Sequence, residues 1–311
     1  MNFVSFDELV SCIYKNLYKI PSDIDLVVGI PRSGTLVANI IALYRNLPFM
    51  DINSFVEKRR LESGSTRKCC NWIKSVEEAK HVLVVDDSIS SGKAIREAKE
   101  KIKKSDISAK MTYLAVYSLT GNAFMVDIHF KMCQQPRMFE WNYMHHWMLE
   151  FVCMDIDGVL CEDPQMRQRM GERQYLDFLK NAIPKIIPTQ KVGALVTGRR
   201  EKYRKQTEMW LYNHNVRYDK LIMMPDDSNL SHHVFKAGIY KQSKYILFFE
   251  SNYEQSMEIC RLTGKPVFCV DEKKLIQTKN LLKQIPTGLT EKKITIKRVV
   301  RKLAHKIDYV K

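Results

Sequence analysis

Short apolar runs rich in β-branched residues alternate with stretches of helical periodicity along most of the chain. Three runs occupy the first half, at residues 24–30, 81–85 and 111–117, with helical stretches such as 36–45 and 93–103 between them. Five more follow, at residues 150–154, 193–197, 220–223, 245–249 and 266–270. Runs that are apolar throughout are typical of parallel strands buried on both faces. The pattern predicts an α/β fold with two units, each built on a parallel sheet.

A polar and aromatic connection, residues 134–148, separates the two series and lacks the Gly and Ser content of a flexible linker. A length of 311 residues suits two domains of ordinary size. We place the boundary near residue 147, which gives units at 1–147 and 148–285 and a separate C-terminal segment at 286–311.

Composition restricts the class of protein further. The formal net charge of +15 indicates anionic partners, which include nucleic acid, diphosphate-containing substrates and acidic membrane surfaces. No apolar run is long enough to span a membrane, and the first residues lack the basic and apolar regions of a signal peptide. The eight cysteines are scattered without a metal-binding spacing. We therefore expect a cytoplasmic protein with reduced thiols.

A loop with two acidic residues follows the apolar run at 81–85 and leads into a helical stretch: Asp-Asp-Ser-Ile-Ser-Ser-Gly-Lys at residues 86–93. Carboxylates at the end of a parallel strand suit the hydroxyls of a sugar, and a Ser/Gly turn that opens a helix suits a phosphate. The loop resembles the signature of type I phosphoribosyltransferases, which use 5-phosphoribosyl 1-diphosphate (PRPP). The resemblance implies a PRPP site made by the ribose-binding pair Asp86 and Asp87, by Ser88, and by the phosphate-binding Ser90, Ser91 and Gly92.

Two further segments stand in the same chain order as in that family. The loop after the first apolar run contains Arg32, Ser33 and Gly34, and resembles the loop that lies against the diphosphate. The basic segment that starts at Lys58 and Arg59 lies where the family has a mobile loop that closes over the leaving group. A basic run is also typical of a solvated face, and both interpretations stay open.

A second pair of carboxylates, Asp155 and Asp157, follows the run at 150–154. Carboxylates at this spacing can supply a nucleophile and a general acid. The segment Asp-Ile-Asp-Gly resembles the first motif of the haloacid dehalogenase (HAD) superfamily of phosphatases. The resemblance implies a Mg²⁺ cofactor and further site residues: Thr197 for the phosphoryl group, Lys236 to neutralise charge, and Glu250 as a metal ligand with Asp155 and Asp157.

Lys241 and Lys244 are alternatives to Lys236, which we prefer because a helix-sized interval separates it from the run at 245–249. The segment between Val159 and Thr197 is too short for a large cap domain. We therefore expect a HAD-like sheet with a small cap or none, and an open site.

The C-terminal segment combines basic and apolar residues. Residues 291–311 contain eight Lys or Arg against Glu291 and Asp308, and their apolar side chains fall at helical spacing on one face. Such a helix can lie on an anionic membrane or dock on the protein body, and both options stay open. No nucleic-acid recognition motif accompanies the basic residues, so we expect no nucleic-acid partner.

The pairing of the two resemblances suggests one overall reaction. The chain resembles fused enzymes of bacterial polysaccharide synthesis, which transfer 5-phosphoribose from PRPP to a glycan, often lipid-linked, with release of diphosphate, and then remove the 5-phosphate. A lipid-linked acceptor would place the protein at the inner face of the membrane. Residues 121–147, the candidate acceptor-binding hood, do not resemble a purine or pyrimidine hood. The alternatives are a nucleobase phosphoribosyltransferase fused to a nucleotidase, and a regulatory protein that senses PRPP.

Overall fold

The computed structural model describes residues 1–61 and 72–278, which form two compact units. The units divide between Tyr143 and Met144, close to the boundary expected at 147. Each contains a largely or wholly parallel sheet, as the apolar runs predict. The expected segment 286–311 lies outside the described residues. Within the described ranges, every helix is too short or too polar to cross a membrane.

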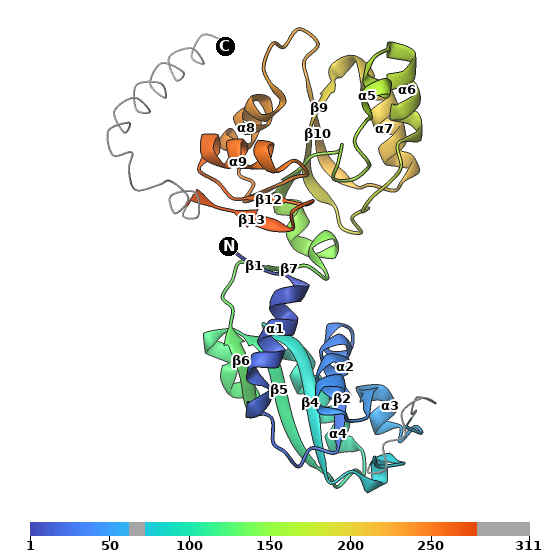
Figure 1. Cartoon of the computed structure of the whole chain (residues 1–311), viewed down its shortest axis with the longest axis vertical. Coiled ribbons are helices and arrows are strands. Elements are labelled where there is room, and N and C mark those ends of the chain that lie inside the picture. The colour runs from blue at the N-terminus through green and yellow to red at the C-terminus, as the bar shows by residue number, and fades with distance from the viewer. Residues whose placement is uncertain (62–71, 279–311) are drawn as a thin grey trace, which may run out of the picture. The chain divides into compact units, whose positions relative to one another are not determined.

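The sheet of the first unit has five parallel strands in the order β3-β2-β4-β5-β6 (Figure 1). Their bounds are β2 Leu26–Gly29, β3 Phe49–Asp51, β4 His81–Ile89, β5 Lys110–Ser118 and β6 Ile128–Met132. In a doubly wound sheet of this 2-1-3-4-5 type, the strand order reverses between β2 and β4, and ligands bind at the carboxyl ends of strands at that point. The loops after β2 and β4 therefore share the edge where a ligand is expected.

Helices cover both faces of this sheet. Their bounds are α1 Phe6–Asn16, α2 Ser33–Arg45, α3 Ile52–Val56 and α4 Lys93–Lys104. Side chains alternate along β4: Leu83 and Val85 pack in one core with α1 and α2, whereas Val82 and Val84 pack in a second core with α3 and α4. The continuous apolar run of β4 follows from this burial on both faces.

The two ends of the first unit lie together. Strand β1 (Asn2–Val4) pairs in parallel with β7 (Arg137–Phe139). Beyond the paired strands, the backbone amide of Phe6 donates a hydrogen bond to the Glu140 carboxylate at 2.8 Å. This pairing holds the segment after β7 beside the start of α1.

The second unit contains a six-stranded sheet in the order β10-β9-β8-β11-β12-β13, in which only β13 is antiparallel to its neighbour. The bounds are β8 Val152–Met154, β9 Val192–Arg200, β10 Tyr218–Met224, β11 Leu247–Glu250, β12 Val267–Cys269 and β13 Lys274–Ile276. The five parallel strands have the doubly wound order 3-2-1-4-5, which reverses between β8 and β11. A ligand is therefore expected where these two strands end.

Figure 1 shows α8 and α9 on one side of β9 and β10, and α5, α6 and α7 on the other. The bounds are α5 Met166–Arg169, α6 Glu172–Asn181, α7 Arg204–Asn213, α8 His232–Gln242 and α9 Tyr253–Thr263. Short 3₁₀ helices complete the described elements: η1 Leu17–Lys19, η2 Val76–Glu78, η3 Thr120–Met125, η4 Tyr143–His145, η5 Trp147–Phe151 and η6 Glu201–Tyr203. Between β8 and β9 the helical elements are only α5 and α6, which leaves little room for a cap.

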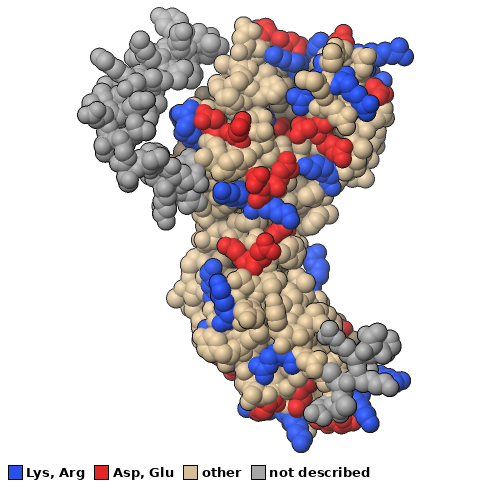
Figure 2. Space-filling model, viewed as in Figure 1, with Lys and Arg blue, Asp and Glu red and all other residues tan. Residues whose placement is uncertain are grey.

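Charge is distributed evenly on the face of the protein drawn in Figure 2. Lys and Arg side chains alternate with Asp and Glu over the described residues of that face, without a single large basic area. The net charge of +15 belongs to the whole sequence, including the basic segment 286–311.

Candidate functional site

The loops after β2 and β4 meet at the edge of the first sheet where a ligand is expected. A Cβ on Gly34 would lie 2.7 Å from the carbonyl oxygen of Val85 and 3.2 Å from Oδ1 of Asp86. Only glycine allows this approach. Arg32 is exposed in the same loop, and Ser33 begins α2. The structure thus brings the two segments expected to bind PRPP into contact.

Asp86 and Asp87 lie within β4, which continues through Ser88 beyond the apolar run. Both carboxylates are buried, and the amide of Asp87 donates to Oδ1 of Asp86 at 2.9 Å. Burial, together with the Asp87 carboxylate, raises the pKa of Asp86 from its usual 3.8 to about 8. At neutral pH the pair therefore offers both a donor and acceptors to the hydroxyl groups of a sugar.

The turn formed by Ser90, Ser91 and Gly92 opens α4. Gly92 has a φ of 72°, and a Cβ there would lie 2.2 Å from the sulfur of Met125, so the turn requires glycine. Arg96 donates to the carbonyl of Ser91 at 3.1 Å. Both serines are exposed at the N-terminus of α4, where an anion is favoured, and the Lys93 amide donates to Oγ of Ser91 at 3.3 Å.

The structure does not bring Lys58 to this turn. Its ammonium forms an ion pair with Asp106 at 2.6 Å, and Asp106 follows the C-terminal end of α4. The turn lies at the N-terminal end of this helix, about 18 Å away for a helix of this length. Arg59 pairs with Glu57 at 2.6 Å. Both interpretations of the basic segment therefore stay open, and residues 62–71 lie outside the described ranges.

Trp141 contacts the acidic pair, which the sequence did not predict. Its indole nitrogen donates to Oδ2 of Asp87 at 2.9 Å. The indole stacks on Phe139 with a centroid separation of 4.7 Å and an interplanar angle of 16°, and lies 5.7 Å from the ring of Phe6. Phe139 is buried, whereas Trp141 is partly exposed and Phe6 is exposed, so two accessible aromatic rings lie beside the expected ribose site.

The expected hood at 121–147 is divided between the two units. His145 and His146 fall in the second unit, where Nδ1 of His145 lies 3.0 Å from the hydroxyl of Thr189. Burial lowers the pKa of His146. Only the part of the hood that ends at Tyr143 belongs to the unit with the acidic pair. The hood at 121–147 therefore stays a prediction, with both histidines in the second unit.

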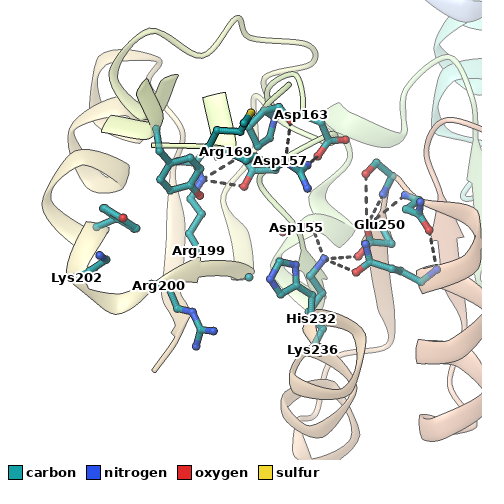
Figure 3. Close-up of a pocket in the computed structure, with 18 of the residues that line it drawn as sticks. Asp155, Asp157, Asp163, Arg169, Arg199, Arg200, Lys202, His232, Lys236 and Glu250 are labelled. Atoms are coloured by element: carbon teal, nitrogen blue, oxygen red, sulfur yellow. Dashed lines mark hydrogen bonds and ion pairs between the residues drawn. The ribbon is translucent and has the colours of Figure 1, made fainter. Parts of the chain in front are cut away.

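In the second unit, Lys236 lies between two buried carboxylates where β8 and β11 end. Its Nζ is 2.6 Å from Oδ2 of Asp155 and 2.6 Å from Oε2 of Glu250 (Figure 3). All three side chains are at most 6% exposed. The alternatives Lys241 and Lys244 are both exposed. Of the three candidate lysines, Lys236 is therefore the one placed to neutralise Asp155.

The three groups hold one positive charge against two negative charges when all are ionised. Burial raises the pKa of Asp155, against the attraction of Lys236. Burial and the Asp155 carboxylate raise the pKa of Glu250 to about 7. The two carboxylates raise the pKa of Lys236, although burial alone would lower that pKa. The lysine therefore stays charged, and the excess negative charge is shared by the carboxylates.

Asp157 is held by a buried arginine. Nη2 of Arg199 lies 2.7 Å from Oδ1 of Asp157, and Nε lies 3.1 Å from Oδ2. The Arg199 side chain is fully buried, whereas that of Asp157 is 17% exposed. The hydroxyl of Thr207 accepts a further bond from Arg199 at 3.3 Å. Asp157 can hold a proton for a leaving group only when Arg199 no longer occupies both of its oxygens.

A cavity of about 610 Å³ opens over these residues. It is lined by residues from the ends of β8, β9 and β11, from α5 and α6, and from the start of α8, among them Asp155, Asp157, Arg169, Tyr175, Arg200, Lys202, His232, Lys236 and Glu250. Thr197 does not line the cavity: it is fully buried, and its hydroxyl accepts the amide of Arg199 at 3.2 Å. The contact of Thr197 with a phosphoryl group stays a prediction.

Asp163 also lines the cavity and was missed in the sequence. A Cβ on Gly158 would lie 2.6 Å from Oδ2 of Asp163 and 2.2 Å from Oγ of Ser251, which places both groups beside the first motif. Burial, together with Asp157 and Asp155, raises the pKa of Asp163. No motif in the sequence identifies this residue, because its position depends on the loop after β8.

The side chains expected to bind Mg²⁺ are paired with basic side chains. Among the described residues, no group of three His, Cys, Asp or Glu is arranged to hold a metal ion. Arg199 occupies the carboxylate of Asp157, and Lys236 lies between Asp155 and Glu250. The ligand set of Asp155, Asp157 and Glu250 stays a prediction.

Comparison with known proteins identifies the class of the first unit. Residues 6–146 match the family model described as a phosphoribosyl transferase domain. This part of the chain is therefore a phosphoribosyltransferase domain with the α/β fold expected from its motifs. No curated protein shows a significant match to the chain.

Solved structures give distant likenesses. A xanthine-guanine-hypoxanthine phosphoribosyltransferase from Helicobacter pylori is 16% identical over 45% of this chain and 90% of its own, with a TM-score of 0.34. A purine phosphoribosyltransferase from Pyrococcus horikoshii is 16% identical over 46% and 95%, with a TM-score of 0.33. A chain of a Pnkp1/Rnl/Hen1 complex is 16% identical over 79% and 94%, with a TM-score of 0.29. Sequence identities and TM-scores this low do not identify a substrate.

Proposed function

We propose that the first unit transfers 5-phosphoribose from PRPP to a glycan acceptor, and that the second unit is a HAD-like phosphatase that removes the 5-phosphate. The observation that carries this proposal is the presence of two separate clusters of polar side chains on one chain. One joins paired carboxylates to a Ser/Gly turn, and the other joins Asp155 to Lys236 and Glu250. The product of the first reaction carries the phosphomonoester that the second would cleave.

In the transferase site, Asp86 and Asp87 would hold the ribose hydroxyls while Ser90, Ser91 and the first amides of α4 bind the 5-phosphate. The loop at Gly34 lies against Asp86, where the diphosphate would leave from C1. Magnesium would enter with the diphosphate of PRPP, because its oxygens are ligands that this ion prefers. The acceptor hydroxyl attacks C1, the bond to diphosphate breaks, and the acceptor proton is released.

In the phosphatase site, the carboxylate of Asp155 would attack phosphorus and displace the sugar alcohol. Lys236 reduces the repulsion between this carboxylate and the incoming phosphate. Water then hydrolyses the aspartyl phosphate. Because the expected metal ligands are not assembled, we derive these steps from the side chains of the chain alone. Asp157 would protonate the leaving oxygen after release from Arg199.

A glycan acceptor is supported by the partly exposed ring of Trp141 and the exposed ring of Phe6, since sugar rings stack on aromatic side chains. A nucleobase would also stack there, and the experiment below separates the two. If the acceptor is lipid-linked, the basic segment 286–311 would bind the anionic membrane surface at the cytoplasmic side.

The test is incubation of the protein with ribose-labelled PRPP and either nucleobases or glycan acceptors, with separate measurement of diphosphate and phosphate release. We expect both products with a glycan, and a ribosylated acceptor without phosphate. Asp155→Asn should stop phosphate release and leave a 5-phosphoribosylated glycan. Products with nucleobases alone would establish the salvage alternative. Phosphate release that continues in Asp155→Asn would refute the phosphatase assignment.

A further inference from the structure

The charged side chains in the wall of the phosphatase cavity are almost all paired. Lys236 pairs with Asp155 and Glu250, Arg199 with Asp157, Lys202 with Glu172 at 3.0 Å, and Arg169 lies 3.9 Å from Asp163. Arg200 also lines the cavity. Among the described residues it forms no ion pair, so its positive charge is not offset by a neighbouring carboxylate contact.

Arg200 is nevertheless held in place. It ends β9, and its Nη1 donates to the carbonyl of Pro225 at 2.7 Å and to that of Ser228 at 2.8 Å. These two carbonyls use one nitrogen of the guanidinium and leave the net charge uncancelled. A guanidinium fixed by backbone carbonyls loses little conformational entropy when an anion binds to its other nitrogens.

The cavity has room for more than a phosphoryl group at Asp155. Its volume of about 610 Å³ falls in the range of sites that enclose whole small molecules. In Figure 3 the side chain of Arg200 lies apart from the cluster of Asp155, Lys236 and Glu250. His232 lies beside that cluster. The unpaired charge is therefore not part of the set of residues that would carry out the reaction.

We propose that Arg200 binds a second anionic group of the substrate, namely a phosphate monoester or diester separate from the phosphate that is cleaved. This inference rests on the proposed phosphatase function. Arg200 is a specificity-determining residue in this account: it favours substrates that carry phosphate at two positions over those that carry one.

The spacing between the two phosphates is tested with a series of alkanediol bisphosphates, from propanediol to octanediol, each compared with its monophosphate. We expect the wild-type enzyme to prefer the bisphosphate at one range of lengths, measured as a ratio of kcat/KM values. Arg200→Gln should lower this ratio by roughly 10-fold, since a charge-assisted hydrogen bond is lost. Lys205→Gln, on the exposed side of α7, is the matched control and should keep the wild-type ratio.

A wild-type enzyme that hydrolyses neither type of substrate would refute the phosphatase function itself. Hydrolysis of both at equal kcat/KM for every length would overturn the second subsite alone, as would an unchanged ratio in Arg200→Gln. If Arg200→Gln does not fold, the proposal is tested by the salt dependence of the wild-type ratio of kcat/KM for bisphosphate over monophosphate. The preference for bisphosphates should fall as NaCl is raised, and a ratio independent of NaCl would overturn the proposal.

Discussion

The indole nitrogen of Trp141 donates a hydrogen bond of 2.9 Å to Oδ2 of Asp87, although the two residues are 54 positions apart. Trp141 follows β7, which pairs with β1 in a separate two-stranded sheet. It links the segment expected to bind the acceptor with a carboxylate expected to bind ribose. Trp141 is thus a positioning residue for Asp87.

Replacement of Trp141 by Phe keeps the stack on Phe139 but removes the N–H donor. Because a hydrogen bond to a charged group contributes about 1.5–3 kcal/mol, we expect the KM for PRPP to rise roughly 10-fold or more. The measurement is the initial rate of diphosphate release at varied PRPP. Trp147→Phe, at a tryptophan that is 66% exposed in the second unit, is the control. An unchanged KM in Trp141→Phe would remove the positioning role.

The raised pKa of Asp86 predicts a pH-dependent stability. The unfolded chain loses the Asp86 proton near its usual pKa of 3.8, whereas the folded, ligand-free protein keeps it until about pH 8. Asp86 therefore destabilises the fold progressively as pH rises through this window. Asp86→Asn should raise Tm by several degrees at pH 8 and by little at pH 4. Thermal unfolding at both values checks this, and an equal change at both would contradict it.

Loss of Lys236 should be costly because it would leave two buried carboxylates without a cation. We expect Lys236→Met to lower the free energy of unfolding by about 3–5 kcal/mol and to abolish phosphate release. Lys241→Met changes an exposed lysine of the same helix and should do neither. Denaturant unfolding is the measurement. Adding Glu250→Gln to Lys236→Met should recover part of the lost stability but no activity; without such recovery, charge would not be the cause.

The C-terminal segment allows a separate prediction about location. Each Lys or Arg near an anionic membrane contributes about 1 kcal/mol of binding. A chain that ends at Pro286 should bind vesicles containing anionic lipid more weakly and with less dependence on salt, while diphosphate release with a short soluble acceptor is retained. Co-sedimentation with vesicles measures this. Equal binding by both chains would reject the membrane interpretation, and loss of activity would assign the segment to the fold.

The order of elements and the main loops could be predicted from the sequence because strands buried on both faces leave continuous apolar runs. Each expected run contains a strand, and β4 and β9 extend past theirs into Asp86–Ile89 and Gly198–Arg200. Lys236 could be chosen over Lys241 from its spacing alone. The short strands β1 and β7 gave no such signal, since three residues are too few to show a period.

Contacts between distant residues were the part that could not be predicted. The Trp141 bond to Asp87 and the ion pair of Lys58 with Asp106 depend on tertiary packing. A sequence motif contains no information on such packing. The arginine after Thr197 illustrates the same limit. The sequence drew attention to the hydroxyl of Thr197, whereas the structure buries it and places Arg199 against Asp157.

The pair of Arg199 and Asp157 changes how mutants of this site must be interpreted. A general acid is usually tested by replacing it with its amide, but Asp157→Asn would also leave a fully buried guanidinium without its anion. A loss of about 3–5 kcal/mol of stability would follow whether or not Asp157 donates a proton. A fall in activity in that variant would therefore mix unfolding with chemistry. Only the double variant Asp157→Asn with Arg199→Met removes both charges together, and so isolates the contribution of the proton.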